Sequence, residues 1–222
     1  MIGIIAAMES EMAYFRERLE GLREETLGGL PCCTGTLDGR EVAVAQCGVG
    51  KVNAAMHAQM LIDRYHVTTL IQTGIGGSLS AKASHLSMVI GTELVYHDMQ
   101  KWVLEQYFPH RLSYPADPQL LEIARRCGSE DTVEGIIATG DIFVDDAATK
   151  TAIARDYGAI CCEMEGAAIA QVAALNGLPC LILRCISDMA DGDAGMTFQQ
   201  FEHIAAEKAA KMVHRIILAL PQ

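Results

Sequence analysis

Short uninterrupted apolar runs recur along the chain, and each one ends where polar residues or glycines begin. Runs of four to ten residues with such boundaries are typical of strands buried on both faces of a sheet. Residues 30–37 and 41–46 are predicted to form a hairpin, because Asp38-Gly39 is a favourable turn between them. The other predicted strands cover residues 1–8, 68–73, 88–97, 133–139, 159–162 and 179–186.

Helical patterns fill the intervals between these strands. Asp117 is the predicted N-cap of one helix, and Asp145 or Asp146 caps another. The predicted helices run from residue 9 to about 19, from just after Gly50 to about 67, and over 118–127, 145–157, 166–175 and 198–220. Because strands and helices alternate without a linker or repeat, we expect a single α/β domain over residues 1–222 with a largely parallel sheet.

In two stretches the apolar residues follow neither the helical nor the strand period. Residues 74–78 read Gly-Ile-Gly-Gly-Ser, and they are predicted to be a loop whose backbone closely approaches another group. Residues 99–118 carry the only tryptophan, several other aromatic residues and three prolines. Long loops inside compact domains are usually functional. We therefore expect either a lid over a binding site or an apolar surface used by a partner subunit.

Charge and hydropathy narrow the function classes. The chain has 17 basic and 28 acidic residues, a formal net charge of −11, and no block of Lys or Arg. Nucleic acids and anionic membranes are therefore not expected as partners. No apolar run approaches the roughly 18 residues of a membrane span. The first residues lack the basic region of a signal peptide, so a cytoplasmic location is expected.

Cysteine and histidine spacing does not predict a metal centre. The eight cysteines include no C-x-x-C pair, and the seven histidines are scattered without the spacing of metal ligands. Several cysteines lie inside apolar runs. They are therefore expected to be free, buried thiols that pack as small hydrophobic groups.

Acidic side chains follow four of the predicted strands. Glu11, Asp141, Glu163 with Glu165, and Asp188 each lie at or just beyond a strand end. The carboxyl ends of parallel strands share one edge of a sheet, so these acids are expected to converge there. Two carboxyl groups in one cleft can divide the roles of acid and base, because like charges and burial separate their pKa values. Cleavage of a glycosidic bond through a cationic transition state uses such a pair.

Four motifs carry a resemblance to a known family. They are Glu163-Met164-Glu165-Gly166-Ala167, Arg184-Cys185-Ile186-Ser187-Asp188, Gly140-Asp141-Ile142-Phe143 and the opening GIIAAMESE. In this order they resemble the bacterial methylthioadenosine/S-adenosylhomocysteine nucleosidases of the purine nucleoside phosphorylase superfamily. The resemblance implies a three-layer α/β/α fold around a mixed, partly closed sheet. It also implies a homodimer that acts on a small purine nucleoside, uses no metal or organic cofactor, and places residues 99–115 near the partner's active site.

The resemblance also implies roles for individual residues. Glu11 matches the general base that activates water, and Asp188 matches the acid that hydrogen-bonds or protonates purine N7. Ser187 matches the neighbour that orients this aspartate, and Glu165 matches the carboxylate that holds the ribose hydroxyls. The other residues carried over to the substrate site are Met8, Val49, Phe143, Val144, Glu163, Met164, Arg184 and Phe198.

Two departures from the family pattern keep alternatives open. Ile75 stands where the family commonly has a serine beside the attacking water, and residues 99–115 differ from the family in length and content. The alternatives are a purine nucleoside phosphorylase, a hydrolase of aminodeoxyfutalosine, and a homologue that binds adenosine-like ligands without turnover. Phosphorolysis needs groups that hold phosphate, whereas Glu11 in a first helical turn favours water.

Overall fold

A computed structural model describes residues 1–221. Its strands are β1 (Ile2–Ala6), β2 (Glu20–Leu27), β3 (Leu30–Leu37), β4 (Arg40–Gln46), β5 (Thr69–Gln72), β6 (Ile75–Ser78), β7 (Met88–Tyr96), β8 (Ser113–Pro115), β9 (Thr132–Thr139), β10 (Ala159–Glu163) and β11 (Cys180–Asp188). Its helices are α1 (Glu9–Arg16), α2 (Lys51–Tyr65), α3 (Lys101–Gln106), α4 (Pro118–Cys127), α5 (Ala147–Tyr157), α6 (Gly166–Leu175) and α7 (Ala194–Ala219).

The strands form one mixed sheet that is closed over part of its width. Their order is β2-β3-β4-β1-β5-β11-β6-β10-β9-β7-β8, and β7 also pairs with β11. That extra pairing closes β11, β6, β10, β9 and β7 into a ring. The strands β4, β1, β5 and β11 run parallel to one another, whereas β6 and β10 pair antiparallel. The predicted mixed, partly closed sheet is therefore confirmed.

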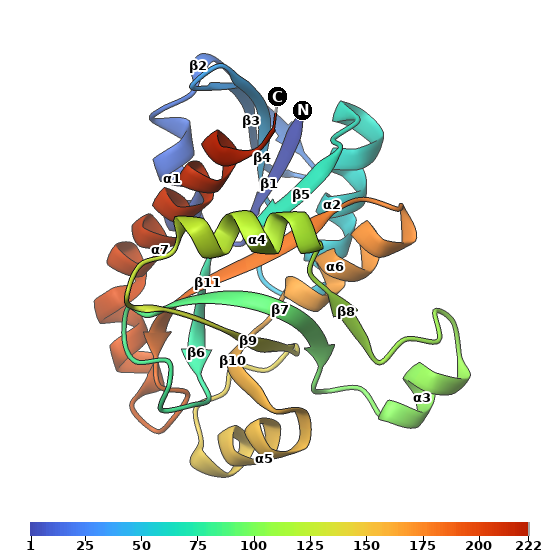
Figure 1. The fold of residues 1–222 in the computed structure, drawn as a ribbon, viewed down its shortest axis with the longest axis vertical. Helices are drawn as coiled ribbons and strands as arrows, with labels where there is room; N and C mark the ends of the chain where they lie inside the picture. Colours follow the sequence, from blue (N-terminus) through green and yellow to red (C-terminus); the bar gives the residue numbers. More distant parts are fainter. Residues whose placement is uncertain (222) are drawn as a thin grey trace.

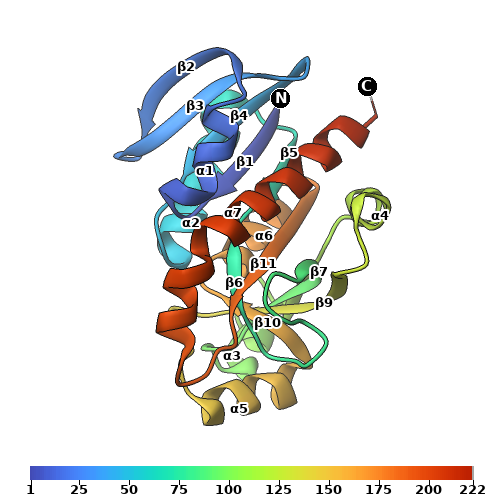
Figure 2. The same cartoon turned by 90° about the vertical axis from the view of Figure 1, so that its left-hand side faces the viewer.

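Helices cover both faces of this sheet. One buried cluster joins apolar residues of α1, α4 and α7 to the sheet, and a second cluster joins residues of α2 and α6 to the opposite face. Figure 2 shows the β2–β3 hairpin at one end of the molecule and α5 at the other. The two chain termini lie near each other at the hairpin end (Figure 1). The three-layer α/β/α arrangement expected from the sequence is confirmed.

Every predicted strand and helix is present, with ends shifted by a few residues. The N-caps of α4 and α5 are Asp117 and Asp146, and each side chain accepts hydrogen bonds from two backbone amides of its first turn. All eight cysteines are free, and all but the half-buried Cys127 are buried, as predicted. Within residues 1–221, no helix combines the length and the apolar character needed to cross a lipid bilayer.

Two predictions of irregular structure were wrong or incomplete, and one strand was not predicted. Residues 75–78, expected as a loop, form strand β6 inside the closed ring. A β-carbon on Gly76 would lie 2.9 Å from the Cys162 carbonyl oxygen, and one on Gly77 would lie 2.9 Å from Asp188 Oδ1, so neighbouring groups approach both glycines closely. Strand β2 was not predicted, because its EGLREETL sequence is largely exposed and carries no apolar alternation. The stretch over 99–118 contains the short helix α3 and the edge strand β8 instead of a continuous loop.

Candidate active site

A cavity of about 260 Å³ opens at the strand ends where the acidic motifs converge. Eleven of the twelve site residues expected from the sequence line it, and Arg184 lies buried behind them. These eleven are Met8, Glu11, Val49, Phe143, Val144, Glu163, Met164, Glu165, Ser187, Asp188 and Phe198. The lining also includes Ala7, Ile75, Gly76, Gly77, Ile142 and Cys162. Sequence reasoning did not assign Cys162 because a thiol inside a strand resembles any other core residue.

Glu11 reaches the cavity from the first turn of α1. Its Oε2 accepts hydrogen bonds from the amides of Ala7 (2.7 Å) and Met8 (3.0 Å), and its Oε1 accepts one from the amide of Ile75 (3.1 Å). Burial raises the pKa of Glu11, while the positive charge of Arg184 and these three amides oppose that rise. The carboxylate is thus fixed in orientation and desolvated, two conditions that make a carboxylate an effective base.

Gly74 is required beside this carboxylate. A β-carbon at Gly74 would lie 2.7 Å from Glu11 Oε1, which is too close for any side chain. The glycine therefore lets β5 and the start of β6 pass directly against the Glu11 side chain. Gly74 lies in the short link between β5 and β6, so this contact gives the first glycine of the Gly-rich stretch a physical role.

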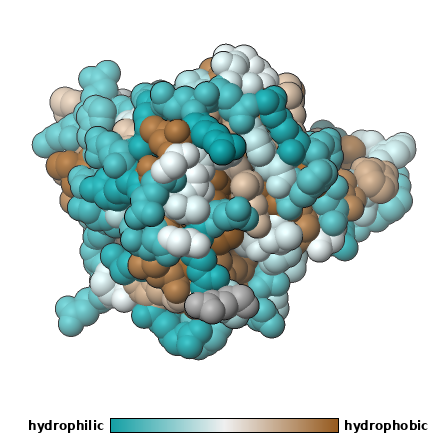
Figure 3. Space-filling view, turned by 90° about the horizontal axis from the view of Figure 1, so that it is seen from above, coloured by the Kyte–Doolittle hydropathy of each residue, from teal (hydrophilic) through white to brown (hydrophobic). Residues whose placement is uncertain are grey.

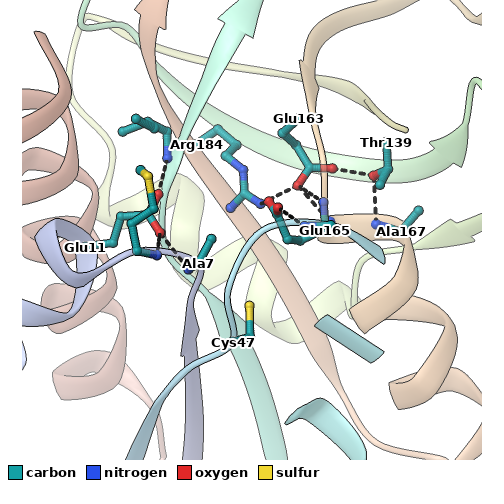
Figure 4. Close-up of polar contacts among 12 residues, drawn as sticks. Ala7, Glu11, Cys47, Thr139, Glu163, Glu165, Ala167 and Arg184 are labelled. Carbon is teal, nitrogen blue, oxygen red and sulfur yellow. Dashed lines mark hydrogen bonds and ion pairs between the residues drawn. The ribbon is translucent and has the colours of Figure 1, made fainter. Parts of the chain in front are cut away.

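Arg184 occupies the centre of a buried acidic cluster. Its guanidinium forms an ion pair with Glu163 and lies 3.5 Å from Glu165 Oε2. Figure 4 shows it between Glu11 on one side and Glu163 with Glu165 on the other. The side chains of Arg184, Glu163 and Glu165 are 1%, 2% and 7% exposed, so their charges interact in a poorly solvated environment.

Glu165 and Glu163 differ in how their oxygens are used. Glu165 Oε1 accepts a hydrogen bond from the amide of Gly50 at 2.9 Å. Burial and the adjacent charge of Glu163 raise the pKa of Glu165, and Arg184 opposes the rise. Glu163 Oε2 accepts hydrogen bonds from the amides of Glu165 (2.9 Å) and Gly166 (2.7 Å), while Oε1 accepts one from a threonine hydroxyl. Glu163 therefore lines the cavity with oxygens already engaged inside the protein.

Asp188 lines the same cavity from the end of β11. Its Oδ1 accepts a hydrogen bond from the amide of Ala190 at 2.9 Å, and its Oδ2 accepts one from the Ser187 hydroxyl at 2.8 Å. Burial raises the pKa of Asp188, and these two donors partly counteract the rise. A carboxyl with a raised pKa keeps its proton to higher pH and can donate it to a bound base.

Apolar side chains complete the walls. The rings of Phe143 and Phe198 meet edge to face, with centroids 6.0 Å apart. Phe143 and Val49 are each nearly half exposed, so they stand at the mouth of the cavity. Apolar walls with a few fixed polar groups are typical of sites for small organic ligands. The cavity can hold a flat ring beside Phe143, and the carboxyl groups of Glu11, Glu165 and Asp188 also line it.

Asp141 does not converge with the other acids, contrary to the prediction. Its side chain is about half exposed, and its Oδ1 accepts a hydrogen bond from the backbone amide of Lys51 at 2.8 Å. Asp98 binds the Lys51 ammonium at 2.6 Å and accepts a hydrogen bond from the Asp141 amide at 2.8 Å. This network braces the loop before α2 against the loop after β9. A strand-end position alone did not show that Asp141 turns away from the cavity.

Residues 99–115 extend away from their own chain's cavity. None of them lines it, and α3 projects to the side of the molecule (Figure 1). The same lobe stands out when the molecule is seen from above, with pale and brown atoms near its tip (Figure 3). Trp102, Tyr107 and Phe108 are 51%, 59% and 76% exposed. Among the residues described, no group of three His, Cys, Asp or Glu side chains is arranged to hold a metal ion.

Comparison with known proteins gives consistent matches over the whole chain. The model of the phosphorylase superfamily matches residues 1–218. A 5'-methylthioadenosine/S-adenosylhomocysteine nucleosidase from Geobacillus kaustophilus is 35% identical, with 99% of this chain and 97% of the relative covered. The nucleosidase from Shewanella halifaxensis is 33% identical, with 99% of both chains covered.

Solved structures give the same result. The nucleosidase from S. pneumoniae, determined with the transition-state inhibitor MT-ImmA, superposes with a TM-score of 0.94 at 33% identity, covering 99% of each chain. The futalosine hydrolase of Helicobacter pylori superposes with a TM-score of 0.93 at 29% identity, covering 99% of this chain and 97% of that structure.

Proposed function

The chain belongs to the phosphorylase superfamily, and from this premise we propose that it hydrolyses the N-glycosidic bond of 5'-methylthioadenosine and S-adenosylhomocysteine. Its relatives named as nucleosidases are N-glycosidases, which supports assigning it to the same class of enzyme. The products would be adenine and the corresponding 5'-thio-substituted ribose. The observation that carries the proposal is that Glu11 and Asp188, from opposite ends of the chain, line one small cavity.

The reaction breaks the bond between ribose C1' and adenine N9 while water adds to C1'. Glu11 accepts a proton from the attacking water. Asp188 donates a hydrogen bond or proton to N7, because a neutral adenine is a much better leaving group than its anion. The sugar becomes cationic in the transition state, and the buried carboxylate of Glu11 stabilises that charge.

The remaining wall residues position the nucleoside. Glu165 holds the ribose hydroxyls, and Met164 packs against the sugar. Phe143 stacks on adenine, while the backbone of Val144 meets the edge of the base. Ser187 orients Asp188 through the hydrogen bond between their side chains. The 5' substituent lies near the apolar side chains Met8, Val49 and Phe198, all of which line the cavity.

Hydrolysis is favoured over phosphorolysis because the cavity offers no cation for phosphate. No Lys, Arg or His is among the described residues that line it. The guanidinium of Arg184, just behind the wall, is engaged by Glu163 and Glu165. Incubation with 5'-methylthioadenosine in phosphate-free buffer should release adenine and the free sugar. Strict dependence on phosphate would contradict the proposal.

A second candidate is hydrolysis of aminodeoxyfutalosine. The observation in its favour is the close superposition on the futalosine hydrolase of H. pylori. Both substrates carry an adenine and a ribose, so the two candidates share the proposed catalytic groups and differ only at the 5' end. Comparison of kcat/KM for the two nucleosides discriminates between them, and we expect 5'-methylthioadenosine to be preferred because the wall near Met8 and Phe198 is apolar.

The proposal includes a cytoplasmic homodimer that needs no cofactor. The exposed aromatic residues of 99–115 would lie near the partner's cavity and enclose the 5' substituent there. Large exposed apolar patches of this kind usually mark contact surfaces. Light scattering on the purified protein tests the assembly directly, and a monomer at micromolar concentration would contradict it.

A further inference from the structure

Thr139 is a fully buried threonine at the end of β9 that does not line the cavity. Its hydroxyl accepts a hydrogen bond from the amide of Ala167 at 2.8 Å. The amide can only donate, so the single hydroxyl proton of Thr139 is free to be donated elsewhere. It is donated to Oε1 of Glu163. The hydroxyl therefore connects the end of β9, the end of β10 and the start of α6.

The Glu163 carboxylate passes this constraint to the site. With Oε1 held by Thr139, Oε2 is directed at the amides of Glu165 and Gly166 and at the Arg184 guanidinium. Figure 4 shows this series of contacts running from Thr139 through Glu163 to Glu165 and Arg184. Because Thr139 donates to Oε1 while the other donors bind Oε2, all contacts of the Glu163 carboxylate form in only one orientation.

Arg184 depends on this anchor. Its Nε has no hydrogen-bond partner among the described residues, and its Nη1 donates only to the carbonyl of Leu183 at 3.1 Å. The position of the guanidinium between the two glutamates is thus set mainly by its ion pair with Glu163. A Glu163 carboxylate that rotated would shift both the backbone of Glu165 and the charge beside its side chain.

We propose that Thr139 is a positioning residue for the ribose subsite, acting through Glu163 on Glu165 and Arg184. The inference rests on the proposed function, because it takes Glu165 as the group that holds the ribose hydroxyls. The residues proposed to meet adenine are Phe143, Val144 and Asp188, whereas the Thr139 hydroxyl bonds only to Glu163 and Ala167. Loss of the Thr139 hydroxyl should therefore weaken recognition of the sugar and leave recognition of the base intact.

The test compares Thr139→Val, which keeps the shape and removes the hydroxyl, with Thr139→Ser, which keeps the hydroxyl. Valine leaves Glu163 Oε1 without its donor and the Ala167 amide without its acceptor. A buried polar group that loses its partner typically costs a factor of about 10–100 in an equilibrium constant. We expect Thr139→Val to lower kcat/KM for 5'-methylthioadenosine by that factor, with KM raised. Its Kd for adenine, measured by calorimetry, should stay within about twofold of wild type. Thr139→Ser should remain within about threefold of wild type in every parameter.

Thr132→Val is the matched control. Thr132 lies at the other end of the same strand, and its hydroxyl contacts only Ser129 of the preceding turn. Its kinetics should equal those of wild type. If Thr139→Val does not fold, Thr139→Ala removes the same hydroxyl together with the threonine methyl group and adds no methyl in its place, and the same expectations apply.

Two results would overturn the inference. One is a Thr139→Val enzyme with wild-type kinetics. The other is equal loss of affinity for adenine and nucleoside without rescue by serine, which would mean general loosening of the fold. A wild-type protein that does not hydrolyse the nucleoside would instead defeat the proposed function on which the inference rests. The wild-type measurement therefore separates the two failures.

Discussion

Replacing Asp188 by asparagine tests the proposed acid with little disturbance of the fold. The asparagine carbonyl can keep the hydrogen bond from the Ala190 amide that now measures 2.9 Å. The new amide group can donate to the Ser187 hydroxyl, which can then donate to the carbonyl of Gly76, at 3.4 Å in the present structure. Since no buried donor or acceptor loses its partner, the free energy of unfolding should change by only about 1 kcal/mol.

The effect on turnover should be much larger. An amide can still form a hydrogen bond to N7, but it cannot give a proton to the departing adenine. Transfer of a proton by a positioned acid typically contributes about 10²–10⁴-fold. At 1.36 kcal/mol for each factor of ten, the barrier should rise by about 2.7–5.4 kcal/mol. Because Asp188 is proposed to act in the chemical step, this loss should appear in kcat rather than in KM.

The pH dependence gives a second signature of the same group. Burial raises the pKa of Asp188 above its ordinary 3.8, although hydrogen bonds from the Ala190 amide and the Ser187 hydroxyl oppose this rise. The acid must be protonated to act, so wild-type kcat/KM should fall as pH rises through the raised pKa, and the variant should lack this fall. The stability that proton binding contributes is likewise present below pH 3.8 and is lost as pH rises through the folded-state pKa.

Adenine release followed by chromatography over a range of pH measures both effects. Asp193→Asn is the matched control, because Asp193 is exposed and does not line the cavity. The reasoning would be refuted by an Asp188→Asn enzyme that turns over within about threefold of wild type and keeps the same alkaline fall. A variant that is inactive because it has unfolded is recognised by its circular dichroism and melting temperature.

Three further predictions address the neighbouring acids. Glu11→Gln should lower adenine release by about 10²–10⁴-fold, because an amide cannot take the proton of water; equal, slow release by both proteins would instead indicate a ligand-binding homologue without turnover. It should also lose about 1–3 kcal/mol of stability in urea unfolding, since three backbone donors then face a single acceptor oxygen. Glu165→Gln should raise KM for the nucleoside about tenfold and leave the Kd for adenine unchanged; a parallel loss for both ligands in calorimetry would remove Glu165 from the ribose subsite. The melting temperature of the wild-type protein should fall in acid as Asp98 becomes protonated, and Asp98→Asn should remove this part of the fall. Burial alone would raise the pKa of Asp98. The hydrogen bond from Lys51 and the positive charge of Lys51 outweigh burial and lower this pKa below 3.8. Its contribution is thus present above pH 3.8 and lost as pH falls through the folded-state pKa; a variant with the wild-type acid profile would contradict this.

The sequence alone determined the alternation of elements and the place of most site residues. Apolar runs such as 68–73 and 179–186 are local signals, because a strand buried on both faces needs consecutive apolar side chains. Glu11, Glu165 and Asp188 follow such runs, and parallel topology then brings strand ends to one edge. These rules fail for β2, where an exposed edge strand has no apolar face, and for β6, where glycines read as a loop.

Tertiary structure decided which polar groups near that edge face the cavity. Asp141 and Asp188 both follow strands, yet Asp141 turns outward to Lys51 while Asp188 is buried beside Ser187. Thr139 has no sequence signal that distinguishes it from any threonine in a strand, and its importance comes from lying within reach of Glu163 and Ala167. Such assignments depend on the packing of segments far apart in the chain, whereas periodicity reports only each segment's preference for helix, strand or burial.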